Sequence, residues 1–478
     1  MLRFLPLPLL LILGACALGP DYKRPDTPPP AHGSFQTATP GTSTADPSGR
    51  WWRLYDDPVL DRLVERALAA NTDLSVARAN LLRAQAVVRE ARSGLLPTGD
   101  LTAGADYGDD QGNHGGSGTV QSRGAQWSSN GAVTIDWEVD LFGRLSRSIE
   151  AARADAAAVE AARDRVALTV AAETTRAYVD ACAYSESVAM ARESARIAER
   201  ELGIQQEREQ AGAGMRLDTE RSATALANIR ATLPTLEGRR RAALFELVAL
   251  LGATPAEVPE EARSCTKAPA PLAAIPVGDG RGLLSRRPDV REAERKLAAE
   301  TARIGIAKAD LYPRISLGGS GNFFRNDSVR GSDSTTFSLG PLISWSWTSA
   351  LVGGSHVDQA RATAQAALAG FRGTLLTALK EVEQALSYFA AESERHQRLG
   401  EAAGHADAAY RLAEERYRAG SIAFLELLEA QRDLLDARAA LAGSSQELGS
   451  RRVDLFKALG SGWEALPPAQ PDQAPPSP

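Results

Sequence analysis

The sequence contains an internal repeat, and this repeat constrains the fold more than any single residue does. Ile135-Asp-Trp137 returns 208 residues later as Ile343-Ser-Trp345. A second register, offset by 216 residues, pairs Pro97 with Pro313, so the first copy carries eight extra residues, which fall in a loop at 108–124. Two copies of one unit in a chain favour a symmetric architecture over a single catalytic cleft.

The N-terminus has the features of an export signal followed by a lipidation site. Residues 1–15 combine a positive charge at Arg3, an apolar run from Phe4 to Leu13 and small residues before Cys16. This is the pattern of a bacterial lipobox, so we expect Cys16 to become the lipidated first residue of the mature chain. Ala17 follows where an acidic residue would favour inner-membrane retention, which favours sorting to the bacterial outer membrane. The alternative is an ordinary signal that is cleaved nearby, with an incidental cysteine.

Composition and charge exclude two classes of protein. No later segment has about 20 uninterrupted apolar residues, so the sequence predicts no transmembrane helix, and a chain that crosses a membrane without one must do so as β-strands. The net charge of −6 shows no excess of basic residues of the kind that binds nucleic acid. Arg and Glu are interleaved along the predicted helices, which is typical of solvated helix faces.

Composition and the repeat divide the chain into six segments. They are a signal peptide (1–15), a lipidated tether rich in Pro, Gly, Ser and Thr (16–50), repeat 1 (51–252), an inter-repeat segment (253–286), repeat 2 (287–463) and a Pro-rich tail (464–478). We expect the tether to lead away from the lipid and the tail to be disordered.

Each repeat opens with a helix that the sequence caps. Asn71 can accept hydrogen bonds from first-turn amides, and Pro288 suits the first helical position. A binding site at Arg286-Arg-Pro-Asp289 is the alternative, but capping explains the run more simply. The helices are predicted to end before Pro97 and Pro313.

A β-hairpin is predicted after each of these helices, at about 98–141 and 313–347. Val133, Ile135 and Trp137 alternate with polar residues, and the second copy repeats the pattern from Phe337 to Trp347. This alternation, with tryptophans near the strand ends, is typical of transmembrane barrel strands. A soluble half-buried hairpin would alternate in the same way, and the export signal favours the membrane. Four strands cannot close a barrel, whereas three chains would supply twelve.

A long Ala-rich helical hairpin is predicted after each β-hairpin, at about 146–252 and 354–460. Gly212 and Gly420 have the positions of C′ glycines that end the outgoing helices. Each outgoing helix would reach roughly 100 Å if unbroken, since an α-helix rises about 1.5 Å per residue. Such a length exceeds what a globular core needs, so we expect a spacer or a tube.

Two cysteines remain after the signal. Cys182 lies midway along a predicted long helix, and Cys265 lies in the inter-repeat segment. In an oxidising periplasm this pair could form one disulfide, which we favour over two free buried thiols.

Catalytic and cofactor motifs are absent from the sequence. The five histidines show no metal-ligand spacing, and no phosphate-binding Gly loop precedes a Lys-Ser/Thr pair. We therefore expect no enzyme activity, no metal site and no cofactor besides the covalent lipid on Cys16.

Several motifs together resemble one family, the outer-membrane factors of tripartite efflux systems, or TolC-like superfamily, and most closely its NodT-type lipoprotein branch. The resemblance covers nearly the whole chain, from the signal to about Trp463. The residues that carry it are Cys16, Gly19-Pro-Asp-Tyr-Lys-Arg-Pro25, Trp137-Glu-Val-Asp-Leu-Phe-Gly143, Ser285-Arg-Arg-Pro-Asp289, Ala293-Glu294, Pro313, Glu381-Val-Glu383 and Gln431-Arg432.

The resemblance implies an α+β membrane protein. It would be a homotrimer with a 12-stranded β-barrel, four strands per chain, in the outer membrane and a 12-helix periplasmic tunnel below it. The function implied is that of a passive exit channel for drugs or other small toxic compounds. Its partners would be outer-membrane lipid, a periplasmic adaptor (membrane fusion) protein and an inner-membrane transporter of the RND type, but no nucleic acid.

The resemblance also implies a gate at the periplasmic tip of the tunnel. The family's aperture residues, a leucine and an acidic residue, fall on Leu425 and Glu429, and Arg416, Tyr417 and Arg418 could supply inter-helix bonds. Repeat 1 carries Leu217 and Arg221 at the equivalent positions, so the acidic ring would come from repeat 2 alone. The alternative is that the leucines are coiled-coil core and Glu429 belongs to a solvated face.

The adaptor is expected to contact the tips of the two helical hairpins, at Gly212, Gly214, Gly420 and Ser421, although these glycines also serve as helix caps. A channel for heavy metals or for protein secretion is a close alternative. A structural coiled-coil lipoprotein is the alternative from another class, and it would not account for two amphipathic β-hairpins.

Overall fold

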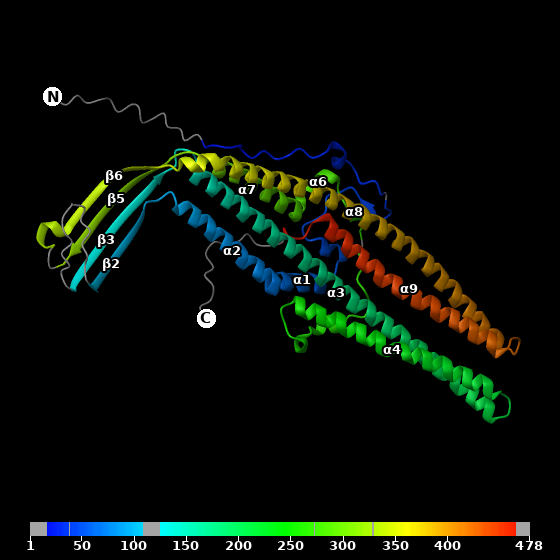
Figure 1. The fold of residues 1–478 in the computed structure, drawn as a ribbon. Helices are drawn as coiled ribbons and strands as arrows, with labels where there is room; N and C mark the ends of the chain where they lie inside the picture. Colours follow the sequence, from blue (N-terminus) through cyan, green and yellow to red (C-terminus); the bar gives the residue numbers. More distant parts are fainter. Residues whose placement is uncertain (1–16, 38, 109–124, 272, 327–328, 465–478) are drawn as a thin grey trace. The chain divides into compact units, whose positions relative to one another are not determined.

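The computed structural model describes residues 17–37, 39–108, 125–271, 273–326 and 329–464 (Figure 1). The predicted signal peptide, Cys16, most of the longer first loop and the tail beyond 464 lie outside the described residues. The chain forms two compact units. Unit 1 comprises Met1–Pro25, Asn80–Val159 and Glu292–Phe371, and unit 2 comprises Asp26–Ala79, Glu160–Arg291 and Arg372–Pro478.

Unit 1 contains a four-stranded antiparallel sheet (Figure 1). Its strands, in spatial order, are β2 (Thr98–Gly108), β3 (Gln126–Val139), β5 (Arg314–Arg325) and β6 (Thr335–Ser344). Each repeat therefore contributes one hairpin, and the two hairpins pair through β3 and β5. Along these strands, every second residue is mostly apolar, and the residues between them are mostly small or polar. Because successive side chains of a strand point to opposite faces, this alternation gives the sheet two different faces.

The register places most apolar residues of the four strands on one face, with Phe324 and Leu342 as exceptions on the other face. Leu101 is opposite Val133, Val133 is opposite Gly321, and Gly321 is opposite Phe337. Ser320 and Ser338 are opposite one another on the other face, where their hydroxyl groups are 2.9 Å apart. The predicted alternation is therefore present as a single apolar face that crosses both hairpins.

Both strands before the long helices end earlier than the alternation suggested. β3 ends at Val139, because the Asp140 carboxylate accepts hydrogen bonds from the backbone N–H groups of Leu145 and Ser146 and caps the next helix. β6 ends at Ser344, which pairs with the first residue of β5, and a helix begins at Trp347.

The helices are arranged as the repeat predicts. In order they are α1 (Pro58–Ala70), α2 (Thr72–Ser93), α3 (Arg144–Gln210), α4 (Arg216–Leu250), α5 (Glu260–Arg263), α6 (Gly280–Arg286), α7 (Pro288–Ala309), α8 (Trp347–Arg418) and α9 (Phe424–Leu459). A short two-stranded parallel sheet pairs β1 (Thr42–Ser43) with β4 (Ile275–Pro276). Within the described parts of the chain, no helix has both the length and the apolar character needed to cross a membrane.

Both predicted helix starts have the expected chemistry. The Asn71 side chain accepts a hydrogen bond from the Leu74 N–H at 3.1 Å, and α7 begins at Pro288. Arg287 forms ion pairs with Asp289 and Glu381. The Arg-Arg-Pro-Asp run thus serves helix packing, as capping predicted.

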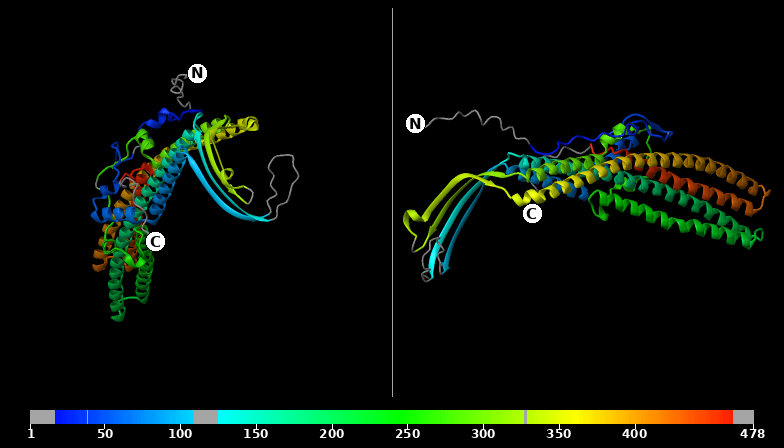
Figure 2. Two further views of the ribbon diagram at one scale, coloured as in Figure 1. Left: turned by 90° about the vertical axis from the view of Figure 1, so that its left-hand side faces the viewer. Right: turned by 45° about the horizontal axis from the view of Figure 1, so that its top comes forward.

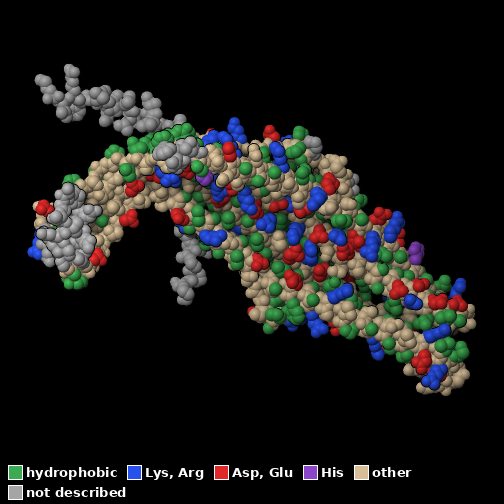
Figure 3. All heavy atoms as spheres, viewed as in Figure 1, with side chains coloured by type: hydrophobic (Ala, Val, Ile, Leu, Met, Phe, Trp, Pro, Cys, Tyr) green, Lys and Arg blue, Asp and Glu red, His purple; other side chains and the backbone are tan. Residues whose placement is uncertain are grey.

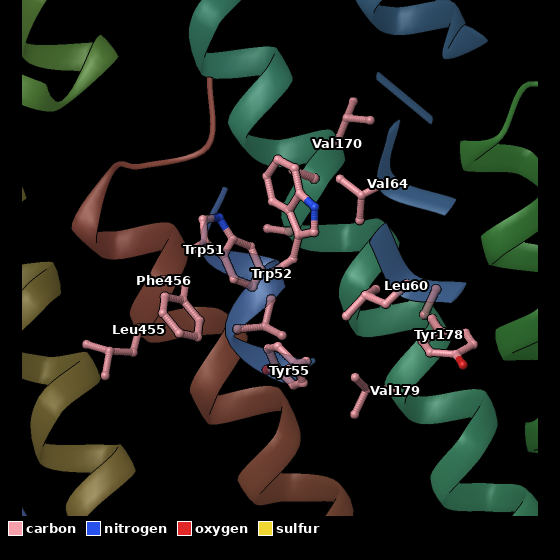
Figure 4. Packing of buried hydrophobic residues seen from close by; sticks show 14 of the residues in the cluster. Trp51, Trp52, Tyr55, Leu60, Val64, Val170, Tyr178, Val179, Leu455 and Phe456 are labelled. Carbon is pink, nitrogen blue, oxygen red and sulfur yellow. The ribbon is translucent and has the colours of Figure 1, made fainter. Parts of the chain in front are cut away.

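In unit 2, the parts of α3 and α8 that begin at Glu160 and Arg372 form antiparallel helical hairpins with α4 and α9, and α3 lies next to α9 (Figure 2). Lys and Arg are interspersed with Asp and Glu along these helices (Figure 3). Their hydrophobic core gathers where the N-terminal segment crosses them: Trp51 stacks on Phe456 with ring centroids 4.5 Å apart, and Trp52 and Tyr55 pack beside them (Figure 4). Burial of such large aromatic side chains stabilises this unit more than the Ala-rich helical contacts can.

Candidate functional site

The sheet of unit 1 presents its apolar face uncovered in the single chain. Phe337 is 90% exposed, Leu339 is 80% exposed and Leu101 is 78% exposed. Monomeric soluble proteins rarely expose contiguous apolar patches of this kind. Among the residues that the structure describes, no further strand lies beside the outer edges of β2 and β6. The sheet is therefore incomplete in one chain, both at its edges and on one face.

Aromatic side chains mark both ends of the strands. At the end nearer the helices, the Trp137 indole N–H donates to the Leu95 carbonyl at 3.0 Å, and Trp345 donates to the Leu311 carbonyl at 3.2 Å. At the loop end, Tyr107 and Trp127 pair across the strands with ring centroids 5.5 Å apart. Two aromatic levels that border an apolar band are typical of strands that span a membrane.

The residues that follow Cys16 are held at the junction between β3 and α3. The Leu18 N–H donates to the Phe142 carbonyl at 3.2 Å, and Arg147 donates to the Leu18 carbonyl at 3.1 Å. Arg147 also forms an ion pair with Asp21 at 2.7 Å. The chain immediately after the predicted lipidation site is thus fixed beside the end of a strand.

The tips of both helical hairpins have the same backbone geometry. Gly212 and Gly420 both have φ of +70°, which favours glycine because it has no Cβ. The Ala213 N–H donates to the Arg208 carbonyl, and the Ser421 N–H donates to the Arg416 carbonyl, as in a Schellman motif. The predicted role of both glycines as helix caps is therefore present in the structure.

Leu425 and Glu429 lie one turn apart on the first part of α9, and both are exposed. They line a groove together with Leu217 and Arg221 of α4, which occupy the equivalent positions in repeat 1. The four residues at these equivalent positions of the two repeats therefore line one groove.

The three residues expected to bond between helices behave differently. The Tyr417 hydroxyl accepts hydrogen bonds from Gln205 at 2.9 Å and from Arg208, both on α3. Arg418 instead forms an ion pair with Glu414 on its own helix. The Arg416 side chain is exposed and has no ion pair within the described part of the chain. Of these three residues, Tyr417 is the one whose described side-chain bonds reach the other hairpin.

Another connection between the hairpins near the tips was not predicted from the sequence. The Tyr410 hydroxyl donates to the Glu201 carboxylate at 2.8 Å, and the buried Gln431 side chain bonds to the same carboxylate. Burial raises the pKa of Glu201, although these bonds work in the opposite direction. The spacing of seven residues between Tyr410 and Tyr417 is the one sequence signal, because it puts both rings on one face of α8.

Cys182 and Cys265 are joined in the structure, with their Sγ atoms 2.05 Å apart and their Cα atoms 5.2 Å apart. Cys182 is fully buried in the hydrophobic core of unit 2. Among the residues that the structure describes, no group of three or more His, Cys, Asp or Glu side chains is placed to hold a metal ion.

An uncovered amphipathic sheet joined to long paired helices defines a membrane channel rather than an enzyme. A family model described as "Outer membrane efflux protein" matches residues 63–253 and again residues 281–461, so each repeat matches it once. The chain belongs to the outer membrane efflux protein family. It is an outer-membrane efflux channel of bacteria and has no enzymatic role.

Known proteins resemble this chain over nearly its whole length. Nodulation protein T of Rhizobium leguminosarum bv. trifolii is 31% identical over 465 residues, which are 95% of this chain and 96% of that protein. The toluene efflux pump outer membrane protein TtgC of Pseudomonas putida is 29% identical over 469 residues, 95% of this chain and 94% of that protein. The solved structure of the outer-membrane channel OprN superposes with a TM-score of 0.85 at 34% identity, covering 94% of this chain and all of that chain.

Proposed function

We propose that three copies of this chain assemble into an exit channel of a tripartite efflux pump. The observation that carries the proposal is the four-stranded sheet, with its uncovered apolar face and two edges that have no further strand. Unpaired edges are costly in a membrane, where no water can satisfy the backbone groups. Three sheets joined edge to edge would close a 12-stranded barrel with the apolar face toward lipid and the polar face toward the lumen.

Lipidation of Cys16 would add an anchor beside this barrel. Support comes from Leu18 and Asp21, which fix the chain two residues and five residues after Cys16 to the region where β3 ends. Acyl chains on Cys16 would therefore enter the same leaflet that the Trp137 side of the barrel borders. A lipid anchor at one terminus attaches the chain to one leaflet but does not span the membrane, so it assists the barrel rather than replacing it.

The helical hairpins would form the periplasmic tunnel, which is closed at its tip in the resting state. Leu425 would supply an apolar ring and Glu429 a ring of carboxylates around the trimer axis. Like charges that converge on one axis repel one another, so bonds between hairpins must hold the tip closed. Tyr417, with Gln205 and Arg208, provides such bonds within one chain.

The adaptor would contact the hairpin tips at Gly212, Gly214, Gly420 and Ser421. A Cβ atom added at Gly212 or Gly420 would meet no other atom within 4 Å, so both turns are open to another protein. Gly214 differs, because a Cβ there would lie 3.0 Å from the Arg208 Cβ atom, so this glycine serves the turn itself.

The pump would contain a periplasmic adaptor and an inner-membrane transporter of the RND type, and the cargo would be drugs or other small toxic compounds. The relatives support this class of cargo: TtgC is named as part of a toluene efflux pump, and another relative as an antibiotic efflux pump protein. A channel for heavy metals or for secreted protein has the same architecture, because the inner-membrane pump selects the cargo.

Two measurements test the proposed function. The purified protein should migrate as a trimer that heating dissociates, and in planar lipid bilayers the double variant Leu425→Ala/Glu429→Ala should conduct more than the wild type. A matched control, Leu376→Ala on α8, removes one exposed leucine that lies far along the helix from the tip and should leave conductance unchanged. Equal conductance of the double variant and the wild type would contradict a gate at these residues.

A further inference from the structure

Residues 17–25, which we call the strap, belong to unit 1 and follow the predicted lipidation site directly (blue in Figure 1). The strap contains the motif Gly19-Pro-Asp-Tyr-Lys-Arg-Pro25, to which neither the channel nor the lipid anchor gives a role. The same holds for Ala293-Glu294 on α7. In the structure these two motifs bind one another, on a site that α3 and α7 form together.

Two glycines let the backbone of the strap lie against the backbone of α7. A Cβ atom added at Gly305 would lie 2.7 Å from the Leu18 carbonyl oxygen, and one added at Gly19 would lie 2.5 Å from the Gly305 Cα atom. Gly19 also has φ of +102°, which favours glycine. A side chain at either position would push the strap away, because it would meet backbone atoms that cannot turn aside.

Arg147 of α3 is buried beneath the strap and bonds to it twice. Its side chain, which is 6% exposed, donates hydrogen bonds to the Leu18 carbonyl at 3.1 Å and to the Asp21 carboxylate at 2.7 Å. It also forms an ion pair with Glu150 on its own helix at 2.7 Å. A buried cation that loses a counter-charge destabilises the fold, so Arg147 favours the bound strap.

Glu294 of α7 is the matching buried anion, with a side chain that is 5% exposed. The Tyr22 hydroxyl donates to it at 3.2 Å, and Arg24 forms an ion pair with it at 3.4 Å. Burial and the charge of Glu294 raise the pKa of Tyr22 to about 12, so the hydroxyl remains a donor at neutral pH. The site thus presents a cation and an anion to a peptide that carries an acid, a phenol and a base in this order.

The internal repeat does not generate a second site of this kind. The residues of the other repeat that are equivalent to Gly305, Glu294 and Arg147 are Arg89, Arg78 and Ser355. A large side chain replaces the glycine, a cation replaces the anion, and a hydroxyl replaces the cation. The site is therefore specific to the pairing of α3 with α7 and is not a consequence of the fold that both repeats share.

The strap crosses from repeat 1 to repeat 2 beside the central pair of strands. The Leu18 N–H donates to the Phe142 carbonyl at 3.2 Å, just after β3 ends. The Phe142 ring stacks on Tyr312, just before β5 begins, with ring centroids 4.7 Å apart. Since β3 and β5 pair the two hairpins, the strap joins the two helices next to the strands that hold the sheet together.

We propose that the strap is an intramolecular ligand, an extended peptide that binds a built site on α3 and α7 and fixes the base of the β3–β5 pair so that the sheet can join its neighbours. Binding of the strap is independent of the proposed function, whereas its effect on assembly rests on the proposed trimer. The role differs from lipid attachment, because the contacts that carry it are made by residues after Cys16.

Limited proteolysis measures whether the strap is bound. Trypsin cleaves after Lys23, which lies between the two strap residues that bond to Glu294. Gly305→Ala should raise the rate of this cleavage by about tenfold, because the added Cβ displaces the strap and cleavage follows the population of the released state. Gly354→Ala is the matched control, since it adds the same methyl group to α8 where no atom lies within 4 Å, and it should change the rate by less than about twofold.

A strap variant keeps the test decisive where a change in α7 impairs folding. Gly19→Ala leaves both helices unaltered and should also raise cleavage after Lys23 by about tenfold. Because its site is then vacated, a fluorescent peptide of residues 17–25 should bind this variant about tenfold more tightly than it binds the wild type. The same peptide should not bind Gly305→Ala. Cleavage at the control rate in both variants, or peptide binding that Gly305→Ala does not weaken, would overturn the strap site.

Trimer assembly measures the consequence. Gly19→Ala and Gly305→Ala should both lower the yield of heat-dissociable trimers in outer-membrane fractions, although both keep Cys16 and should incorporate labelled palmitate as the wild type does. Wild-type yields in both variants, with the strap released, would overturn its role in assembly. A wild-type protein that forms no trimer would instead contradict the proposed function, and the proteolysis and peptide results would still decide the strap site.

Discussion

Single buried charges decide the pH response of the helical hairpins. Glu201 lies where α3 meets α8 and α9, with Tyr410 and Gln431 as its partners. Burial raises the pKa of this carboxyl above the ordinary glutamate value of 4.5. A raised pKa means that the ionised form is disfavoured in the folded chain, so Glu201 lowers the stability at neutral pH and the loss disappears as the pH falls below 4.5.

Glu201→Gln should therefore stabilise the channel more at pH 7 than at pH 4. The amide keeps the shape of the carboxyl and can still accept the hydrogen bond from Tyr410, but it has no charge to desolvate. The measurement is the difference in apparent melting temperature between variant and wild type at the two pH values. If the difference in melting temperature is the same at both pH values, or larger at pH 4, ionisation of Glu201 does not destabilise the folded chain.

Asp164 is also a buried carboxylate with a raised pKa, but unlike Glu201 its bonding partners are cations. It is 1% exposed and bonds to Arg163 and, at 3.2 Å, to Arg291. Burial raises the pKa of Asp164 despite these two cations. The network costs desolvation to form, but removing one member leaves a buried cation without its closest counter-charge.

Asp164→Asn should accordingly lower the free energy of unfolding by about 3–5 kcal/mol. Asp358→Asn provides the comparison, because Asp358 pairs with Arg361 on the surface and its loss should cost less than about 1 kcal/mol. Denaturant titration of detergent-solubilised protein measures both. Equal losses would mean that the buried network contributes no more than an exposed pair does.

At the scale of the element, the features that could be predicted from the sequence are those set by residues close together in the chain. Gly420 and Pro288 set helix boundaries by their own backbone preferences, so those boundaries could be predicted, and Ile135 and Trp137 followed from a period of two. The strand ends could not be predicted, because β3 ends where the Asp140 side chain caps the following helix. The bonds between Glu201, Tyr410 and Gln431 were also missed, because they depend on the relative register of three long helices.

The inter-repeat segment is the element whose attachment can be tested most directly. Its Cys265 is joined to Cys182 on α3 across 83 residues of sequence. Closing a loop of this length restricts the unfolded chain, which corresponds to about 4.5 kcal/mol in the loop-entropy model. Cys182→Ala/Cys265→Ala should lower the stability of the channel by about that amount.

The apparent melting temperature measures this effect, and wild-type protein treated with a thiol reductant should match the double variant. The double variant itself should not respond to the reductant. Mass spectrometry after alkylation without reduction gives an independent test. If both thiols of the mature wild-type protein are alkylated, the disulfide does not form in the cell and the stability prediction fails with it.

At the scale of the whole molecule, the chain is built as a fraction of an assembly. Repeat 1 and repeat 2 each supply a β-hairpin and a helical hairpin, so three chains present six near-equivalent units around one axis. Because the six units are nearly equivalent, they can close a tube. Residues that differ between repeat 1 and repeat 2 can have different roles in it. The equivalent positions Arg221 and Glu429 carry opposite charges, and this difference between the repeats falls at the proposed gate.

Closure of that tube in the membrane makes the two faces of the sheet respond differently to charge. Leu339→Lys on the apolar face of β6 should block outer-membrane assembly, since a lysine that faces lipid costs about 2–4 kcal/mol in each of three copies near the middle of the bilayer. Ser338→Lys, the neighbouring residue on the polar face, lies at the same depth and should leave assembly intact while altering ion selectivity. Heat-dissociable trimers in outer-membrane fractions measure assembly, and reversal potentials in bilayers measure selectivity. If both lysine variants assemble equally well, β6 does not face lipid and the proposed barrel is wrong.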